Sequence, residues 1–381
     1  MALKRKLAVW RAVLLATSVA ALAFASGAPA HAEDLNELNA QILANPQDAA
    51  LNLHYAQVAE EQGKLRLALA AYERILINNP DNADAQHGYE RVRRILEPTR
   101  TSFRVEFGEQ WDSNPLDSSV DNESAYTTFV NGTWVDERRF GARRWRTLVN
   151  FQVEVTPEID ELNYGYVGAS IGPIIDLTPS SAAIPAIGFA VSSFSNVFYY
   201  DEINAGVTVE GHRDSLTYWT RLRAGWRDYG EDSTATQGAY AELMGGLSVP
   251  RIFSDNDSLF VVPWVRWSGI QGTAHDFLED PIAPGEYAEY GAEATYRYRL
   301  NDHLFVSAGV QARDRYYSRT EVAGKNRHDT YVAPKAGITL WNPLSCSCGL
   351  TLSYQYRNNN SNDPFSDYDA QQTTFSISRQ F

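Results

Sequence analysis

The chain has 381 residues, a formal net charge of −14 at pH 7 and an aromatic content of 12%, including 21 Tyr and 9 Trp. This negative charge argues against a nucleic-acid partner, because binding to nucleic acid relies on basic side chains that neutralise phosphates. Beyond residues 1–32 no run approaches the roughly 20 mostly apolar residues of a spanning helix, so a bundle of membrane helices is excluded.

Residues 1–32 have the pattern of a secretory signal peptide. Basic residues at positions 4–11 precede an apolar run over 12–25, and Ala30-His31-Ala32 supplies the small residues of a cleavage site. We therefore expect export across the inner membrane of a Gram-negative cell. Since no Cys stands near this site, nothing indicates a lipid anchor on the chain itself.

Residues 33–97 form a segment with helical spacing. Apolar residues fit one helix face over 51–59 and another over 65–76, and a third helix is predicted over 83–96. A turn is expected between the first two helices, at 61–64.

The same segment resembles tetratricopeptide repeats. Pro46 and Pro80 stand about 34 residues apart, which is the period of that repeat. The small, turn, small, aromatic and terminating positions of the repeat are matched by Ala56, Gly63, Ala68, Tyr72 and Pro80. Asn52 stands where the repeat usually has a Trp.

The segment holds only about one and a half repeats and a partial third helix, fewer than the three or so that bury a continuous core. We therefore expect it to pack against the rest of the chain, another subunit or a partner. Two roles are open: a periplasmic platform that docks a peptide or protein, and a structural plug or spacer.

From residue 98 onward the pattern changes to the alternation of β-strands, which predicts a large barrel over residues 98–381. We expect about fourteen antiparallel strands, or twelve if the weakly marked fifth and sixth are not both present. An even number places both ends of the barrel on one side, where the helical segment must also lie. The predicted strands are 101–111, 124–137, 143–157, 163–175, 183–194, 197–210, 215–228, 238–248, 258–268, 286–300, 303–317, 329–341, 348–358 and 371–381.

The last strand best shows why the barrel should be a transmembrane one. Phe375, Ile377 and Phe381 share one face, which Arg379 interrupts, and the other face is polar. Such strands suit an outer-membrane barrel, which turns apolar side chains to lipid and polar ones to its lumen. A terminal Phe also resembles the signal that the barrel-assembly machinery reads. The alternative is the edge strand of a soluble β-sandwich.

Charged residues fall on the predicted lumen face of three strands, because Arg is costly against acyl chains. These candidates are Arg221, Arg223, Arg227, Glu289, Glu293, Arg297, Arg299, Arg313 and Arg315. The arginines could form an electropositive strip that guides an anionic solute or an unfolded chain. Alternatively they pair with Glu289, Glu293, Glu106 and Glu154 in a salt-bridged lumen that keeps the barrel rigid.

Connections should be short on the periplasmic side and long outside. We predict short ones at 211–214, 301–302 and 342–347, and long ones at 112–123, 269–285, 318–328 and 359–370. Three acids in the last of these, Asp363, Asp367 and Asp369, suit either calcium or plain solvation. The Cys346 and Cys348 pair is either a disulfide or two thiols with local packing roles.

No enzymatic motif is present. The sequence lacks a Gly-rich phosphate loop, HExxH and Gly-x-Ser-x-Gly. His275 with Asp276, and His328 with Asp329, have no third residue to complete a catalytic set. We expect no catalysis, no cofactor and no metal.

A resemblance to a known family rests on the ends of the barrel. Its residues are Asp112-Ser113-Asn114, Tyr356-Arg357, Ser361-Asn362 and Tyr368, followed by Phe375 and Phe381. With the helical segment before the barrel, these resemble the surface lipoprotein assembly modifier family, known as Slam. The helical segment is much shorter than in that family.

The resemblance implies an outer-membrane barrel that helps a lipoprotein or secreted protein reach the cell surface. Its expected partners are outer-membrane lipids, the barrel-assembly machinery and a protein client bound by the helices in the periplasm. The alternative is a passive or polysaccharide-export channel with a helical docking module. A third class, a structural or adhesive surface protein, would rest on the outer loops.

Overall fold

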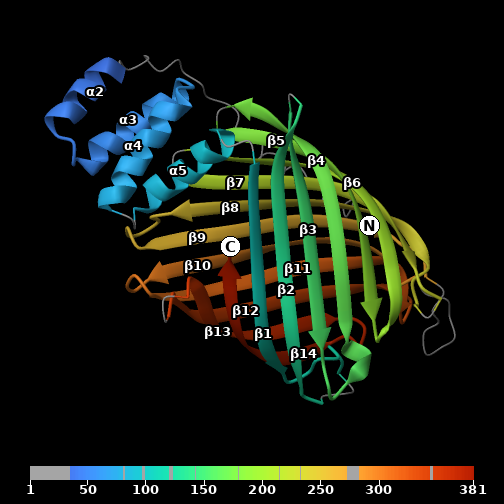
Figure 1. Ribbon diagram of the computed structural model, residues 1–381. Coiled ribbons are helices and arrows are strands. Elements are labelled where there is room, and N and C mark those ends of the chain that lie inside the picture. Colours follow the sequence, from blue (N-terminus) through green and yellow to red (C-terminus); the bar gives the residue numbers. More distant parts are fainter. Residues whose placement is uncertain are drawn as a thin grey trace. The chain divides into compact units, whose positions relative to one another are not determined.

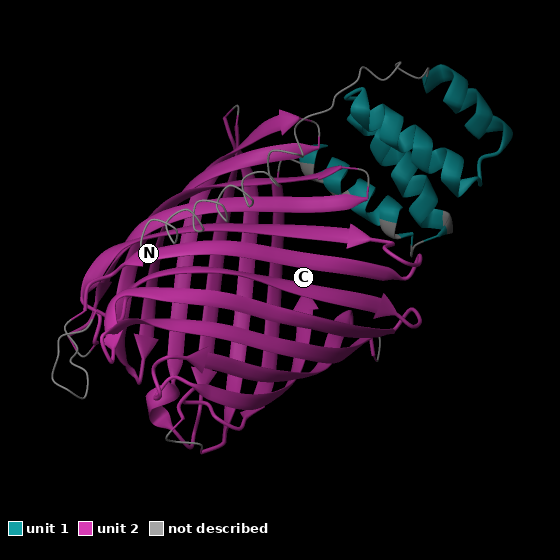
Figure 2. Ribbon diagram, turned by 180° about the vertical axis from the view of Figure 1, so that it is seen from behind, with its two compact units in different colours: residues 1–96 teal, residues 97–381 magenta. Residues whose placement is uncertain are grey.

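The computed structural model describes residues 35–79, 82–96, 99–119, 123–141, 143–178, 180–213, 215–231, 233–272, 283–343 and 346–381. The chain divides into two compact units, residues 1–96 and 97–381, coloured separately in Figure 2. The predicted signal peptide and Pro80, His275 and Asp276 lie outside the described residues. None of the helices in the described ranges is long and apolar enough to cross a membrane.

The first unit is helical. The helices predicted over 51–59, 65–76 and 83–96 are present, and a further helix precedes them. In chain order the helices are α2 (Leu35–Ala44), α3 (Ala49–Glu61), α4 (Leu65–Asn78) and α5 (Ala83–Leu96).

Local chemistry explains where these helices begin and turn. Asp48 caps α3 by accepting a 3.0 Å hydrogen bond from the Leu51 backbone N–H. Gly63, between α3 and α4, has φ +72°, a conformation that glycine adopts without strain. Ala56 and Ala68 are fully buried where the two helices pack. These small residues let the helices approach closely.

A buried polar cluster ties α3, α4 and α5 together. Glu60 is buried and accepts hydrogen bonds from the Tyr72 hydroxyl at 3.0 Å and from Arg91 Nε and Nη2 at 2.7 and 2.8 Å. Burial, together with the Glu60 carboxylate, raises the pKa of Tyr72, so its hydroxyl stays protonated and donates. The Tyr72 ring also packs against Gly88 so closely that a Cβ there would meet it at 2.3 Å.

Asn52 takes a polar role at the position where the repeat usually has a Trp. It is buried, and its amide donates to the backbone carbonyls of Pro46 and Asp48 at 3.1 and 2.8 Å. Its carbonyl accepts a 3.0 Å hydrogen bond from Arg74. The amide of Asn52 therefore fixes the start of α3 by hydrogen bonds. In the tetratricopeptide repeat, the Trp at this position would pack there instead.

The second unit is a closed antiparallel barrel, which confirms the predicted fold class with fourteen strands in the described part of the chain. Each strand pairs with its sequence neighbours, and β1 pairs with β14, beside which it lies in Figure 1. The strands are β1 (Thr99–Asp112), β2 (Ala125–Phe140), β3 (Arg143–Val155), β4 (Tyr164–Thr178), β5 (Ser181–Phe194), β6 (Val197–Arg213), β7 (Leu216–Tyr229), β8 (Gln237–Pro250), β9 (Asp257–Gly269), β10 (Glu286–Arg299), β11 (Leu304–Val322), β12 (Lys325–Trp341), β13 (Cys348–Ser361) and β14 (Tyr368–Gln380).

The two faces of the barrel wall differ as the alternation requires. Ile187, Phe189 and Phe375 are exposed, as large apolar residues are on many strands. Arg146 on β3 forms a 2.6 Å ion pair with Glu210 on β6, although β4 and β5 lie between them in the sheet. That pair therefore crosses the interior, and the exposed apolar residues form the outer surface that suits lipid. A soluble sandwich is excluded because the sheet has no edge.

One connection differs from expectation, and one weakly marked pair of strands is confirmed. The long loop predicted over 318–328 is wrong, because β11 runs to Val322 and β12 begins at Lys325. A register shift between Tyr316 and Glu321 lets the hairpin continue to a two-residue turn. The uncertain fifth and sixth strands are both present, joined at Ser195 and Asn196, and both of these residues have positive φ. Because the turn has only two residues, the sequence between β5 and β6 contains no stretch with the composition of a loop.

We expect Arg91→Ala to lower the free energy of unfolding of the helical unit by about 2 to 3 kcal/mol, because Glu60 loses a guanidinium that makes two of its hydrogen bonds. The rate of chymotrypsin cleavage within α3 to α5, measured on the full chain in detergent, should rise accordingly. Arg66→Ala, on the exposed face of α4, is the control and should leave this rate unchanged. Equal rates for the two variants would contradict the structural role of the cluster.

Candidate functional site

Three buried glutamates lie on alternate strands of the barrel wall. Glu202 on β6, Glu242 on β8 and Glu289 on β10 are only 1%, 6% and 1% exposed. Arginines on the intervening strands surround them. We call this set the lumen belt, and it consists of Glu202, Arg221, Arg223, Arg227, Glu242, Arg266, Glu289, Arg313 and Arg315.

Strand register produces the belt. Arg223 lies directly opposite Glu242, and Glu242 opposite Arg266. Arg266 in turn lies opposite Glu289, and Glu289 opposite Arg315. Opposite charges placed directly across antiparallel strands stabilise the pairing. A row of alternating sign therefore runs over β7 to β11.

At the β6 end, Glu202 is held by several donors. Arg227 Nε donates at 2.8 Å, and Asn204 Nδ2 donates at 2.8 Å. The Tyr240 hydroxyl from β8 donates to the same carboxylate, and Arg223 Nη1 stands 3.6 Å away. The carboxylate is thus satisfied with little access to water.

The other two glutamates have similar surroundings. Glu242 accepts from Arg266 Nε at 2.7 Å and from Arg221 Nη2 at 3.1 Å. Glu289 accepts from Arg315 Nη2 at 2.6 Å and from the Trp264 indole at 2.7 Å. Buried carboxylates need such charge-assisted bonds to offset the loss of hydration.

Aromatic rings cover several of the guanidinium groups. The Arg227 guanidinium lies 4.7 Å from the ring centres of both Tyr200 and Tyr240. Arg313 stands 4.5 Å over Tyr331 on β12. Such stacking stabilises a cation on one face while its edge stays available for hydrogen bonds.

The structure brings most of the predicted charged residues together but leaves others apart. Glu293 pairs with Lys335 on β12. Arg297 stacks 4.0 Å over Phe305 and has no carboxylate partner among the described residues, and Arg299 donates to Asn256 Oδ1 at 3.0 Å. The predicted pairing of arginines with Glu106 and Glu154 is not observed within the described ranges.

Sequence reasoning missed Glu202, Glu242 and Arg266. A signal exists for Glu242 and Arg266, since each alternates with apolar residues on its strand, whereas Glu202 follows Asp201. Placing them opposite their partners requires the register, however, which depends on exact turn positions.

A second cluster lies at the pairing of β1 with β14, which we call the seam. Arg357 on β13 reaches past β14 to form ion pairs with Asp112 at 2.6 Å and with Asp117 at 2.8 Å. It also donates to the Asn114 carbonyl at 3.2 Å, and its guanidinium lies 6.0 Å from the Tyr368 ring centre. Four residues of the family resemblance therefore meet in one place with Asp117, and we call this set the seam cluster: Asp112, Asn114, Arg357, Tyr368 and Asp117.

Loops on both sides strengthen the seam. The Ser113 N–H donates to the Gln371 carbonyl at 2.9 Å, and Ser113 Oγ accepts from the Gln371 N–H at 2.8 Å. Ser119 Oγ donates to the Pro364 carbonyl at 2.6 Å. The β1–β2 connection is thereby fastened to the β13–β14 connection.

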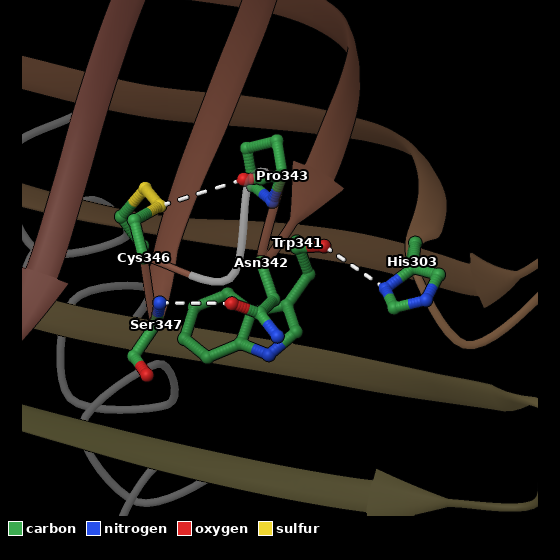
Figure 3. Close-up of a disulfide and its surroundings, with 7 residues drawn as sticks. His303, Trp341, Asn342, Pro343, Cys346 and Ser347 are labelled. Carbon is green, nitrogen blue, oxygen red and sulfur yellow. Dashed lines mark hydrogen bonds between the residues drawn. A yellow bond between two sulfur atoms is a disulfide. The ribbon is translucent and has the colours of Figure 1, made fainter.

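Cys346 and Cys348 form a disulfide in the connection between β12 and β13 (Figure 3). In the same turn, the Ser347 N–H donates to Asn342 Oδ1 at 2.8 Å, and Asn342 has φ +53°. His303 Nδ1, in the neighbouring connection, stands 3.2 Å from the Trp341 carbonyl oxygen. Of the two alternatives left by the sequence, the structure has the disulfide.

Several of the remaining candidates within the described residues are held by ion pairs or by stacking. Among the described residues, no group of three His, Cys, Asp or Glu is placed to hold a metal. Asp363 pairs with Arg327 at 3.3 Å. His328 lies 3.2 Å from Asp314 Oδ1 and stacks on Tyr316, whereas Asp329 pairs with Arg327. His328 and Asp329 therefore do not form a pair.

Comparisons with known proteins bear on this barrel. The family model described as surface lipoprotein assembly modifier matches residues 267–381, which confirms the predicted resemblance for that region. No curated protein matches the chain. Together with the closed barrel, the family match identifies the chain as an outer-membrane β-barrel.

Solved structures with a similar fold are outer membrane proteins of low sequence identity. The outer membrane channel DcaP of Acinetobacter baumannii has a TM-score of 0.44 and 7% identity, covering 74% of this chain and 97% of its own. OmpT of Vibrio cholerae has a TM-score of 0.39 and 8% identity, covering 75% and 100%. An outer membrane channel of Pseudomonas putida F1 has a TM-score of 0.42 and 8% identity, covering 75% and 97%.

We expect Arg357→Ala to destabilise the closed barrel by about 3 kcal/mol, because the buried Asp112 carboxylate loses the cation that pairs with it. The measurement is the temperature at which the protein loses its compact, SDS-resistant mobility in electrophoresis, which should fall. Arg104→Ala serves as the control, since Arg104 lies on β1 opposite Gln380 and has no ion pair in the described part of the chain. A fall of equal size in both variants would show that the seam cluster has no special role.

Proposed function

We propose that this outer-membrane barrel assists the surface display or secretion of a lipoprotein or another protein client. The observation that carries the proposal is the family match over residues 267–381, a region that includes β10 to β14 and Arg357 of the seam cluster. The name of that family refers to the assembly of surface lipoproteins. The seam cluster gives the resemblance a physical basis, because its residues are far apart in sequence and in contact in the fold.

We further propose that residues 33–97 form a periplasmic module that gathers the client and that residues 98–381 form the membrane barrel. Helix α5 ends at Leu96 and β1 begins at Thr99, so the chain enters the barrel at the end with the short connections. Short connections are periplasmic in barrels of this type. Exposed apolar side chains on the module, such as Leu43 and Ile77, suit contact with an apolar segment of a client.

The seam is the place where we propose that the wall interacts with a client. Strands β1 and β14 pair from Arg104↔Gln380 to Asp112↔Gln372, whereas β1 and β2 pair from Thr99↔Arg138 onward. The seam therefore has fewer backbone hydrogen bonds than its neighbour. Opening it would take less energy than opening the β1–β2 pair, once the seam cluster is released.

A second candidate function is a passive or polysaccharide-export channel. Its supporting observation is a cavity of about 190 Å³ lined by hydroxyl and amide groups from β10 to β14. Most of these groups are uncharged donors and acceptors, which form hydrogen bonds with a neutral sugar. The lining includes Thr295, Ser307, Lys335, Ser353, Gln355, Gln372 and Thr374.

Deletion of the gene separates the two candidates. We expect brief protease shaving of intact cells, followed by mass spectrometry, to show the loss of one or two proteins from the surface while they remain inside the cell. The full-length gene should restore them, whereas a version without residues 35–96 should not, because the client would not be gathered.

The control is the amount of each barrel in the outer membrane, which must be equal in the complemented strains. An unchanged surface proteome in the deletion strain would refute protein export and leave solute passage as the function.

A further inference from the structure

We propose that the lumen belt is an anion-selecting strip of the barrel wall, which favours solutes bearing carboxylate or phosphate groups over cations. This inference does not depend on the protein client, because it concerns only the charge and geometry of the barrel wall. Of the two roles that the sequence left open for the arginines, the proposal takes the electropositive strip over the salt-bridged lumen that only keeps the barrel rigid.

The charges of the belt do not balance. Within the described residues the belt joins six arginines to three glutamates through contacts of 4.0 Å or less. A wall that needed only rigidity would be served by equal numbers of the two signs. The belt therefore carries an excess of positive charge.

Distances divide the arginines into two groups. Arg227, Arg266 and Arg315 make the short bonds, at 2.8, 2.7 and 2.6 Å, to Glu202, Glu242 and Glu289 respectively. Each buried glutamate thus has one arginine that holds it closely. We call these three the holding arginines, and they account for the neutralisation of the three carboxylates.

The other three arginines, which we call the loose arginines, are Arg221, Arg223 and Arg313. Arg223 stands 3.6 and 3.8 Å from two different carboxylates, and Arg313 stands 4.0 Å from one, so neither makes a short hydrogen bond to the belt. Arg221 makes one bond at 3.1 Å. The Nε atoms of Arg221 and Arg223 are buried without a hydrogen-bond partner among the described residues.

Aromatic rings position the loose arginines for a ligand. The guanidinium of Arg223 lies 5.4 Å from the centre of Tyr240, and that of Arg313 lies 4.5 Å from the centre of Tyr331. A guanidinium held on a ring keeps its N–H edge available, and that edge matches two oxygens of a carboxylate or phosphate. The side chains of Arg223 and Arg313 are 24% and 27% exposed and make no short bond to a glutamate, so their terminal N–H groups suit an anion.

Neighbouring charges do not cancel the excess. The seam cluster adds two carboxylates, Asp112 and Asp117, against Arg357, and Lys335 balances Glu293. On β12, Asp329 lies opposite Arg315 and, with Asp363, pairs with Arg327, which adds one further negative charge. The sum over all these groups stays positive. Rings of Arg or Lys are the device by which pores favour anions, and low-dielectric walls strengthen their field.

The test is the reversal potential of the purified full-length barrel in a planar bilayer under a potassium chloride gradient. We expect chloride to be more permeable than potassium. In the double variant Arg223→Gln with Arg313→Gln, the chloride-to-potassium permeability ratio should fall by about twofold or more, because two loose arginines are lost while the holding arginines remain. Added inorganic phosphate should reduce the chloride current of the wild type more than that of the double variant.

The matched control is Arg138→Gln, the same chemical change at an arginine that pairs with Asp136 on β2, outside the belt. It should leave the permeability ratio unchanged. SDS-resistant mobility shows whether each variant is folded. In the Glu242→Gln variant the chloride-to-potassium permeability ratio should rise, because a carboxylate of the belt is removed.

The proposal is overturned by a wild-type barrel that passes no ion current, by one that prefers potassium, or by a folded double variant with an unchanged ratio. None of these outcomes bears on the surface proteome of cells, so protein export and anion selection can fail separately.

Discussion

The barrel depends on the need to pair every backbone group that would otherwise meet hydrocarbon, where each unpaired N–H or C=O costs several kcal/mol. Pairing of β1 with β14 meets this need, and reciprocal backbone hydrogen bonds between Phe103 and Phe381 extend it. Once the sheet is closed, alternate side chains have to face inward. The gathering of charged residues in the interior follows from this closure.

Charged side chains in this interior are only partly hydrated, so hydrogen bonds from the protein must stabilise them. Glu202 and Glu289 are almost completely enclosed, and each accepts hydrogen bonds both from an arginine and from an aromatic side chain, Tyr240 or Trp264. Removal of one partner from such a group costs more than the pair contributes. Substitution of a loose arginine should therefore destabilise the barrel much less than substitution of a holding arginine.

The sequence predicts the strands well because alternation is a local property. Even β5 and β6 follow from it, although the turn at Ser195 and Asn196 gives no loop signal. The contacts of the lumen belt are not local. They depend on register across the sheet, and a shift of one residue would reverse the faces of a strand. This is why Glu289 was found but its partner Arg266 was not, and why Glu106 and Glu154 were mistaken for partners.

The seam cluster has a consequence for how the chain folds. Arg357 and Asp112 are 245 residues apart, and Gln372 donates to Asp112 over 260 residues. Contacts of such high separation form late, because the entropy of bringing the ends together must be overcome after the nearer hairpins exist. The Arg357 ion pairs can therefore form only when the first and last strands have met. These ion pairs therefore stabilise only the completed barrel, and a partly assembled sheet lacks their contribution.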